Sequence, residues 1–177
     1  MAGLTSQERL QPSLLDRLTD REPSASREAL EARVLNKGQL RAAVLRDLTW
    51  LFNTARAEPD PARGDPDEVE RWRAVPHARN SVLNFGIPSL SGITISAMHF
   101  GALEAAIRLA IVQFEPRIDP KTLAVEVNRE AGFNIQHNSL RLVIRGHMWN
   151  QPVPLELLLS ADVDVETGMA AVRDMRG

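Results

Sequence analysis

The sequence predicts an α+β domain in which N-terminal helices pack on one face of a small antiparallel β-meander. Apolar residues recur at a helical spacing in residues 39–55 and again in residues 98–118. After Ile118 the spacing changes to two, in three segments joined by short connections. Helices followed by a run of strands are typical of the α+β class. The 177 residues, 44% of them hydrophobic, are enough for one such core.

Composition excludes several functional classes. The chain has no cysteine, which excludes disulfides, thiol catalysis and cysteine-based metal sites. A formal net charge of -2 leaves no electrostatic footprint for nucleic acid, so we expect no nucleic-acid partner. Residues 1–18 are polar without an apolar signal core, and no segment is long and apolar enough to span a bilayer. We therefore expect a soluble, non-exported protein with no direct membrane insertion.

Residues 1–36 are predicted to form a partly disordered N-terminal arm, ahead of a single domain at 37–173. A short apolar set within the arm has the length of one helical turn and is expected to dock elsewhere on the chain: Leu14, Leu15 and Leu18.

The segment 39–55 is predicted to be a helix with one core stripe. Trp50 lies off this stripe and is expected to pack at its edge, with a role as a contact anchor as the alternative. The stripe consists of Leu40, Val44, Leu48, Leu51 and Phe52.

Two dissimilar segments follow this helix. Residues 58–73 are rich in proline and acidic residues, so we expect a flexible insertion with at most a brief helical turn at 68–72. Residues 80–92 are too apolar for a free linker and are expected to pack along the core. Their apolar anchors are Val82, Leu83, Phe85, Ile87 and Leu90.

The segment 98–118 is predicted to be a largely buried helix that ends at a Glu-Pro-Arg corner. Pro116 disfavours helical geometry in the residue before it, so the helix should end near Phe114 or Glu115. A carboxylate on Glu115 then meets the negative end of the helix dipole, which costs ~0.3–1 kcal/mol. The corner is either a helix stop with two solvated charges or a functional contact. The expected core residues are Leu103, Ile107, Ile111 and Phe114, with Leu109 and Val112 on a second buried face.

Three alternating segments predict strands: around 123–127, around 140–145 and, longest, 153–166. The segment 169–173 is a candidate for a fourth short strand. Exposed edges of a sheet recruit other chains by strand addition. We expect 153–166 to be the docking edge, with Leu155, Leu157 and Leu158 as partner-binding residues.

No motif predicts a cofactor or a metal site. Phosphate loops, dinucleotide fingerprints and serine elbows are absent, and the four histidines lack metal-ligand spacing. A lysozyme-like peptidoglycan hydrolase is the enzyme alternative, since Glu115 could pair with Asp119 or Glu130 as the two carboxylates that such an enzyme needs. Nothing in the spacing selects either partner.

The order of several motifs resembles the TssE family, the baseplate subunits of bacterial type VI secretion systems, related to a baseplate wedge protein of contractile-tail phages. Phe85 stands where a tyrosine is more usual, and 58–73 looks like an insertion. The motifs are Ser13-Leu14-Leu15-Asp16-Arg17-Leu18, Asp47-Leu48, Asn53-Thr54, Ser81-Val82-Leu83-Asn84-Phe85-Gly86-Ile87-Pro88, Ser91-Gly92, Phe114-Glu115-Pro116-Arg117, and Trp149 with Pro152.

The resemblance implies a structural, non-enzymatic role in the cytoplasm, at the inner face of the bacterial envelope. It implies a place beside the wedge proteins TssF and TssG and near TssK, with a sheet from which the TssB–TssC sheath begins to polymerise. It also implies that Glu115, Pro116 and Arg117 contact the wedge core.

Overall fold

The computed structural model describes residues 13–19, 24, 36–90, 93, 98–128, 139–149 and 153–176. Helices precede a four-stranded antiparallel sheet, so the predicted α+β class is confirmed. Within the described ranges, no helix has the length and apolarity needed to cross a bilayer. The elements are α1 (Leu14–Leu18), α2 (Lys37–Phe52), α3 (Pro66–Ala74), α4 (Pro76–Arg79), η3 (Val82–Asn84), α5 (Phe100–Phe114), β1 (Ala124–Val127), β2 (Ser139–Met148), β3 (Leu155–Asp164) and β4 (Ala170–Asp174).

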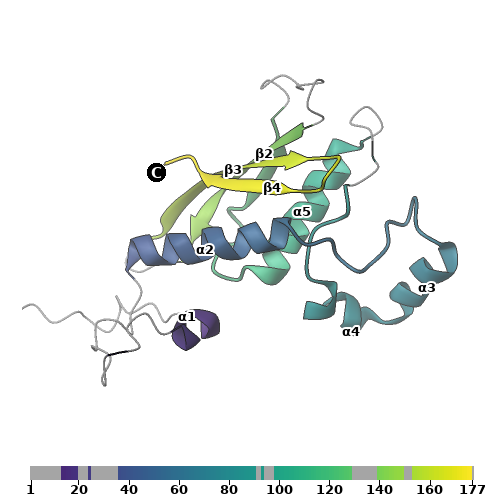
Figure 1. Cartoon of the computed structure of the whole chain (residues 1–177), viewed down its shortest axis with the longest axis horizontal. Helices are drawn as coiled ribbons and strands as arrows, with labels where there is room; N and C mark the ends of the chain where they lie inside the picture. The colour runs from purple at the N-terminus through teal and green to yellow at the C-terminus, as the bar shows by residue number, and fades with distance from the viewer. Residues whose placement is uncertain are drawn as a thin grey trace, which may run out of the picture.

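Helix α2 runs beneath β3 and β4 in Figure 1 and supplies one side of the core. It begins at a capping box: the Asn36 side chain accepts from the Gln39 N–H, and the Gln39 side chain accepts from the Asn36 N–H, both at 2.9 Å. The whole predicted stripe of this helix is buried, and Trp50 lies off it with half of its surface exposed.

Helix α5 ends at Phe114, as the proline at 116 predicts. It buries Leu103, Ile107 and Ile111 against the sheet. The prediction that Leu109 adds a second buried face is wrong, because this side chain is 61% exposed. A helix packed on one sheet has one buried stripe, and a residue about half a turn away from it faces solvent.

The strands lie in the order β1-β2-β3-β4, and every neighbouring pair is antiparallel. The longest pairing joins β2 to β3, from Ser139 opposite Asp164 to Met148 opposite Leu155. Buried residues alternate with less buried ones along both strands, so one face of the sheet packs on the helices. The other face carries cross-strand ion pairs such as Arg141–Asp162, at 2.5 Å.

The prediction that segment 153–166 forms an edge of the sheet is wrong. The fourth strand, β4, pairs with β3 from Leu159 to Val163, so β3 is an interior strand. Of the three leucines predicted to bind a partner, Leu157 is 1% exposed and belongs to the core. The edges of the sheet are β1 and β4. Local alternation identifies a strand, but strand order depends on pairings that are remote in sequence.

Both edges are covered in part by side chains from helices. At β1, the Glu104 carboxylate of α5 accepts from the Val127 N–H at 2.8 Å, and the Arg108 side chain donates to the Leu123 carbonyl at 3.1 Å. Such cover occupies main-chain groups that would otherwise pair with another chain.

At β4, α2 supplies the cover. The Asn53 carboxamide accepts from the Ala170 N–H and donates to the Ala170 carbonyl, both at 2.9 Å. At the other end of the strand, Arg41 pairs with Asp174 at 2.7 Å.

Residues 53–90, which follow α2, contain more helix than predicted. The expected brief turn is the nine-residue helix α3, which Asp65 caps and which buries Val69. The apolar loop packs on the core through Phe85, Ile87 and Leu90, but Val82 and Leu83 face outward from η3 and are 79% and 70% exposed.

Gly86 lets this loop approach the end of α2. Its φ is +127°, and a Cβ placed there would lie 2.4 Å from the Thr54 carbonyl oxygen. The next residue can therefore pair with that chain: the Ile87 N–H donates to the Thr54 carbonyl, and the Ile87 carbonyl accepts from the Arg56 N–H, both at 2.9 Å.

Candidate functional site

The Glu-Pro-Arg corner is held between the end of α5 and the end of β2. The Glu115 N–H donates to the Ile111 carbonyl at 2.8 Å, which closes the helix. Two residues later, the Arg117 carbonyl accepts from the Trp149 N–H at 2.7 Å. Pro116 between them is exposed and has a restricted φ. The corner therefore has a defined backbone conformation.

Of the two interpretations of the corner, a helix stop with two solvated charges does not fit Glu115, which is only 2% exposed. Its carboxylate accepts from the Arg117 Nε at 2.6 Å and from the Arg117 backbone N–H at 3.2 Å, and Arg117 Nη2 donates to the second oxygen. A bidentate pair of this kind is strong and directional. It explains how a carboxylate is accommodated at the negative end of a helix.

Arg117 also joins α5 to α2. Its Nη2 donates to the Asp47 carboxylate at 2.5 Å, across 70 positions of sequence. Burial alone would lower the pKa of Arg117, but the hydrogen bonds that Arg117 donates to Glu115 and Asp47, together with their negative charges, outweigh burial and raise the pKa. The guanidinium is therefore a fixed positive charge at the junction of the two helices.

Arg46 continues this network to the N-terminal arm. It donates to Asp47 at 2.8 Å and to Asp16 of α1 at 2.5 Å, and its guanidinium lies 5.3 Å from the centre of the Trp50 ring. The hydrogen bond from Arg46 lowers the pKa of Asp16, although burial acts in the opposite direction. The apolar turn, which is α1, is thus attached to α2 by the ion pair between Asp16 and Arg46.

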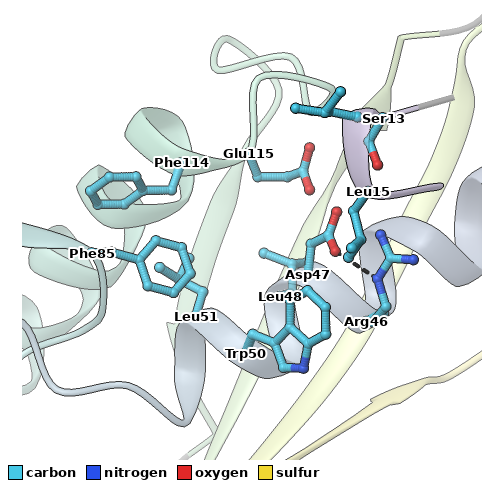
Figure 2. Close-up of a pocket in the computed structure, with 11 residues that line it drawn as sticks. Ser13, Leu15, Arg46, Asp47, Leu48, Trp50, Leu51, Phe85, Phe114 and Glu115 are labelled. Atoms are coloured by element: carbon cyan, nitrogen blue, oxygen red, sulfur yellow. Dashed lines mark hydrogen bonds and ion pairs between the residues drawn. The ribbon is translucent and has the colours of Figure 1, made fainter. Parts of the chain in front are cut away.

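A cavity of about 330 Å³ lies beside this network. Figure 2 shows the rings of Phe85 and Phe114 on one side, α1 on the other, and Glu115 and Asp47 between them. The two rings meet edge to face at 5.1 Å. The wall is largely apolar and includes Leu15, Leu48, Trp50 and Leu51. The cavity can accept an apolar side chain close to fixed charges.

The structure brings some predicted site residues together and separates others. Leu155 and Leu158 are partly buried on β3, a different element from the corner. Asp119 accepts from the Lys121 N–H at 2.9 Å, and Glu130 lies outside the described residues. Among the residues that are described, no three His, Asp or Glu side chains gather as a metal site.

Sequence reasoning missed Arg46 and Asp47 as members of the site. They are adjacent opposite charges beside the apolar stripe of α2, and Asp47 stands in a motif of the resemblance. That signal marks two polar residues at a core boundary, but it does not identify their partner. The Arg117 contact requires knowledge of how α2 and α5 pack.

A family model described as baseplate wedge protein gp25 matches residues 38–153. The chain belongs to this family. TssE proteins are members of the gp25 baseplate wedge family, so the resemblance is confirmed at the level of the family. The matched range contains α2 from its second residue onward, the Phe85 loop and the Glu-Pro-Arg corner, whereas α1 lies outside it. No curated protein and no solved structure matches the chain.

The gp25 baseplate wedge family is a structural family of phage baseplates and related contractile injection machines, which is compatible with a non-enzymatic role. Membership indicates assembly with other baseplate and tail components.

Proposed function

We propose that the chain is a cytoplasmic baseplate subunit of a bacterial type VI secretion system, with its domain at 37–173 carried on an N-terminal arm at 1–36. It binds wedge proteins of the TssF and TssG type, near TssK, and initiates a sheath of the TssB–TssC type. The match of residues 38–153 to the gp25 baseplate wedge family is the observation that carries this proposal.

The wedge contact is assigned to the corner of Glu115, Pro116 and Arg117. Because Glu115 is buried, its role is to position Arg117, and the partner meets the exposed Pro116 and the part-exposed Arg117. A guanidinium held by two carboxylates has little side-chain freedom left to lose when a partner binds, which favours affinity.

The test is co-purification and titration of the chain with its wedge proteins. Arg117→Lys keeps the charge but loses the planar fork, and we expect binding to weaken on the order of tenfold. Arg145→Ala, on the solvent face of the sheet, is the matched control and should bind as the wild type does. Wild-type binding by a folded Arg117→Lys variant would remove the corner from the wedge interface.

Sheath docking is assigned to the first residues of β3. The pairing of β3 with β4 covers Leu159 to Val163, and one more hydrogen bond joins the Met175 N–H to the Leu158 carbonyl at 3.0 Å. The first residues of β3, Leu155 to Leu157, therefore extend beyond the end of β4. By the alternation of antiparallel pairing, the main-chain groups of Glu156 point to this open side. Arg41 holds the Glu156 carbonyl at 2.9 Å and would release it to an incoming strand.

A proline at Glu156 tests this assignment. This substitution removes the Glu156 N–H, which is the main-chain donor on the open side. It spares the hydrogen bonds between β2 and β3, because the N–H and carbonyl of Glu156 both point away from β2. Glu156→Ala is the control, because it keeps the N–H. Sheath assembly should fail with Glu156→Pro and proceed with Glu156→Ala; normal sheath with a folded Glu156→Pro variant would refute the docking site.

A further inference from the structure

Helix α1 rests on the domain by few contacts. None of its five residues is buried, and Leu14 and Leu18 are 71% and 73% exposed. Its firmest attachment is the Asp16 carboxylate, which is 5% exposed and lies 2.5 Å from Arg46. A five-residue helix is too short to be stable by itself, so its conformation depends on this docking.

The cavity beneath α1 is incompletely filled. Leu15 lines it from the α1 side, and about 330 Å³ remains between α1 and the aromatic pair of Phe85 and Phe114 (Figure 2). Larger side chains than those of α1 would bury more apolar surface there.

Two guanidinium nitrogens in the network need an acceptor. Arg46 Nη2 and Arg117 Nη1 are buried and have no hydrogen-bond partner among the described residues. Buried donors are nearly always paired in native proteins, and leaving one unpaired is unfavourable. The single carboxylate of α1 is already engaged by Arg46 Nη1 and by the Ser13 hydroxyl.

We propose that α1 is an exchangeable cover on this cavity, and that a partner protein replaces it with a helix that carries a carboxylate beside an apolar side chain. The carboxylate takes the place of Asp16, so the charge balance of the network is kept. Without the Ser13 hydroxyl that donates to the second oxygen of Asp16, the corresponding oxygen of the partner can accept from an unpaired guanidinium nitrogen. The apolar side chain fills the cavity. The inference rests on the proposed function, because the covered network includes the wedge-binding Arg117.

A fluorescent peptide with the sequence of residues 11–21 serves as the probe, since it carries the helix of α1 in trans. Binding to the full chain is followed by anisotropy. Asp16→Asn weakens the internal cover, so this variant should bind the peptide on the order of tenfold more tightly than the wild type. Asp162→Asn, on the solvent face of the sheet, is the control and should match the wild type.

Two results would overturn the proposal. One is equal peptide affinity for the wild type and Asp16→Asn. The other is unchanged affinity when the probe carries asparagine in place of its aspartate at position 16. This assay contains no wedge protein, so its result is independent of the Arg117→Lys titration.

Hydrogen exchange of the backbone amides then tests whether α1 is replaced when the chain is part of an assembly. In the wild-type chain bound to its wedge proteins, the amides of residues 14–18 should exchange faster than in the free chain. Equal or stronger protection of these amides in the complex would show that α1 stays in place, and the proposal would fail.

Discussion

At the scale of single residues, Glu115 is unfavourable by local rules and is stabilised by a tertiary partner. A carboxylate at the carboxyl end of a helix opposes the helix dipole. Arg117 offsets this unfavourable interaction, because its side chain and its backbone N–H both donate to the Glu115 carboxylate. The Arg117 guanidinium also donates to Asp47, which fixes its position. The three groups therefore act as a unit, and removing one changes the environment of the others.

Arg117→Ala should destabilise the fold as well as the interface. The substitution leaves the buried Glu115 carboxylate without its counter-charge, and we expect the free energy of unfolding in urea to fall by roughly 3 kcal/mol. Arg145→Ala breaks an exposed pair at 3.8 Å and should leave stability nearly unchanged. Equal midpoints for the two variants would show that the corner contributes nothing to stability.

At the scale of elements, helices protect the edges of the sheet. A four-stranded sheet has two edges, and here α5 covers part of β1 while α2 covers part of β4. The start of β3 extends past β4, so it is the natural place for an added strand.

Asn53→Ala should loosen β4. Both hydrogen bonds to Ala170 are lost together, and we expect unfolding free energy to fall by about 1–3 kcal/mol. Hydrogen exchange should speed up in 170–174 and remain slow in β2. Uniform acceleration over the whole sheet would mean that Asn53 supports the core and has no specific role at the edge.

Acid should undock α1. The hydrogen bond from Arg46 lowers the pKa of docked Asp16, whereas an undocked Asp16 keeps the ordinary pKa of an aspartate. The undocked state therefore binds protons more readily, so docking is fully present above that ordinary pKa and is lost as the pH falls through the lowered pKa. NMR shifts of residues 14–18 should report this transition, and Asp16→Asn should lack it.

The insertion should be dispensable for folding. Replacing residues 60–73 with a short Gly-Ser linker keeps Glu58, which pairs with Arg79 at 2.8 Å, and removes most of α3. Loop length has a small effect on stability, so we expect a loss below about 1 kcal/mol. A large drop in melting temperature would show that Val69 and its neighbours form part of the main core.

At the scale of the whole molecule, the two surfaces that we propose for assembly lie at separate places: one is the Glu-Pro-Arg corner with the cavity beneath α1, and the other is the start of β3. The core of α2, α5 and the sheet holds these places in a fixed relation. This arrangement is consistent with the proposed role between wedge proteins and a sheath.

The purified chain should not cleave peptidoglycan. Glu115, the candidate acid of a hydrolase, has its carboxylate engaged by Arg117 and is 2% exposed, which leaves little of its surface for contact with a sugar. Turbidity of a cell-wall suspension should remain constant with the wild type. Clearing that disappears in Glu115→Gln would instead assign the chain to the hydrolases.

The sequence by itself determined the two long helices, the strands and the family. The change of period after Ile118 predicted helices and then strands, Pro116 predicted the end of α5, and the motifs around Glu115 and Phe85 led to the baseplate resemblance. These signals are local, since they depend on side chains a few positions apart.

Only the tertiary structure decided which charges are buried and which strand is interior. Arg117 meets Asp47 across 70 positions, and β3 becomes interior because β4 folds back onto it. Neither contact can be found from the sequence pattern. A hydrogen bond between remote elements depends on two single positions, and two positions do not produce a repeat along the sequence. The same applies to the ion pair of Asp16 on α1 with Arg46 on α2, which lie 30 positions apart.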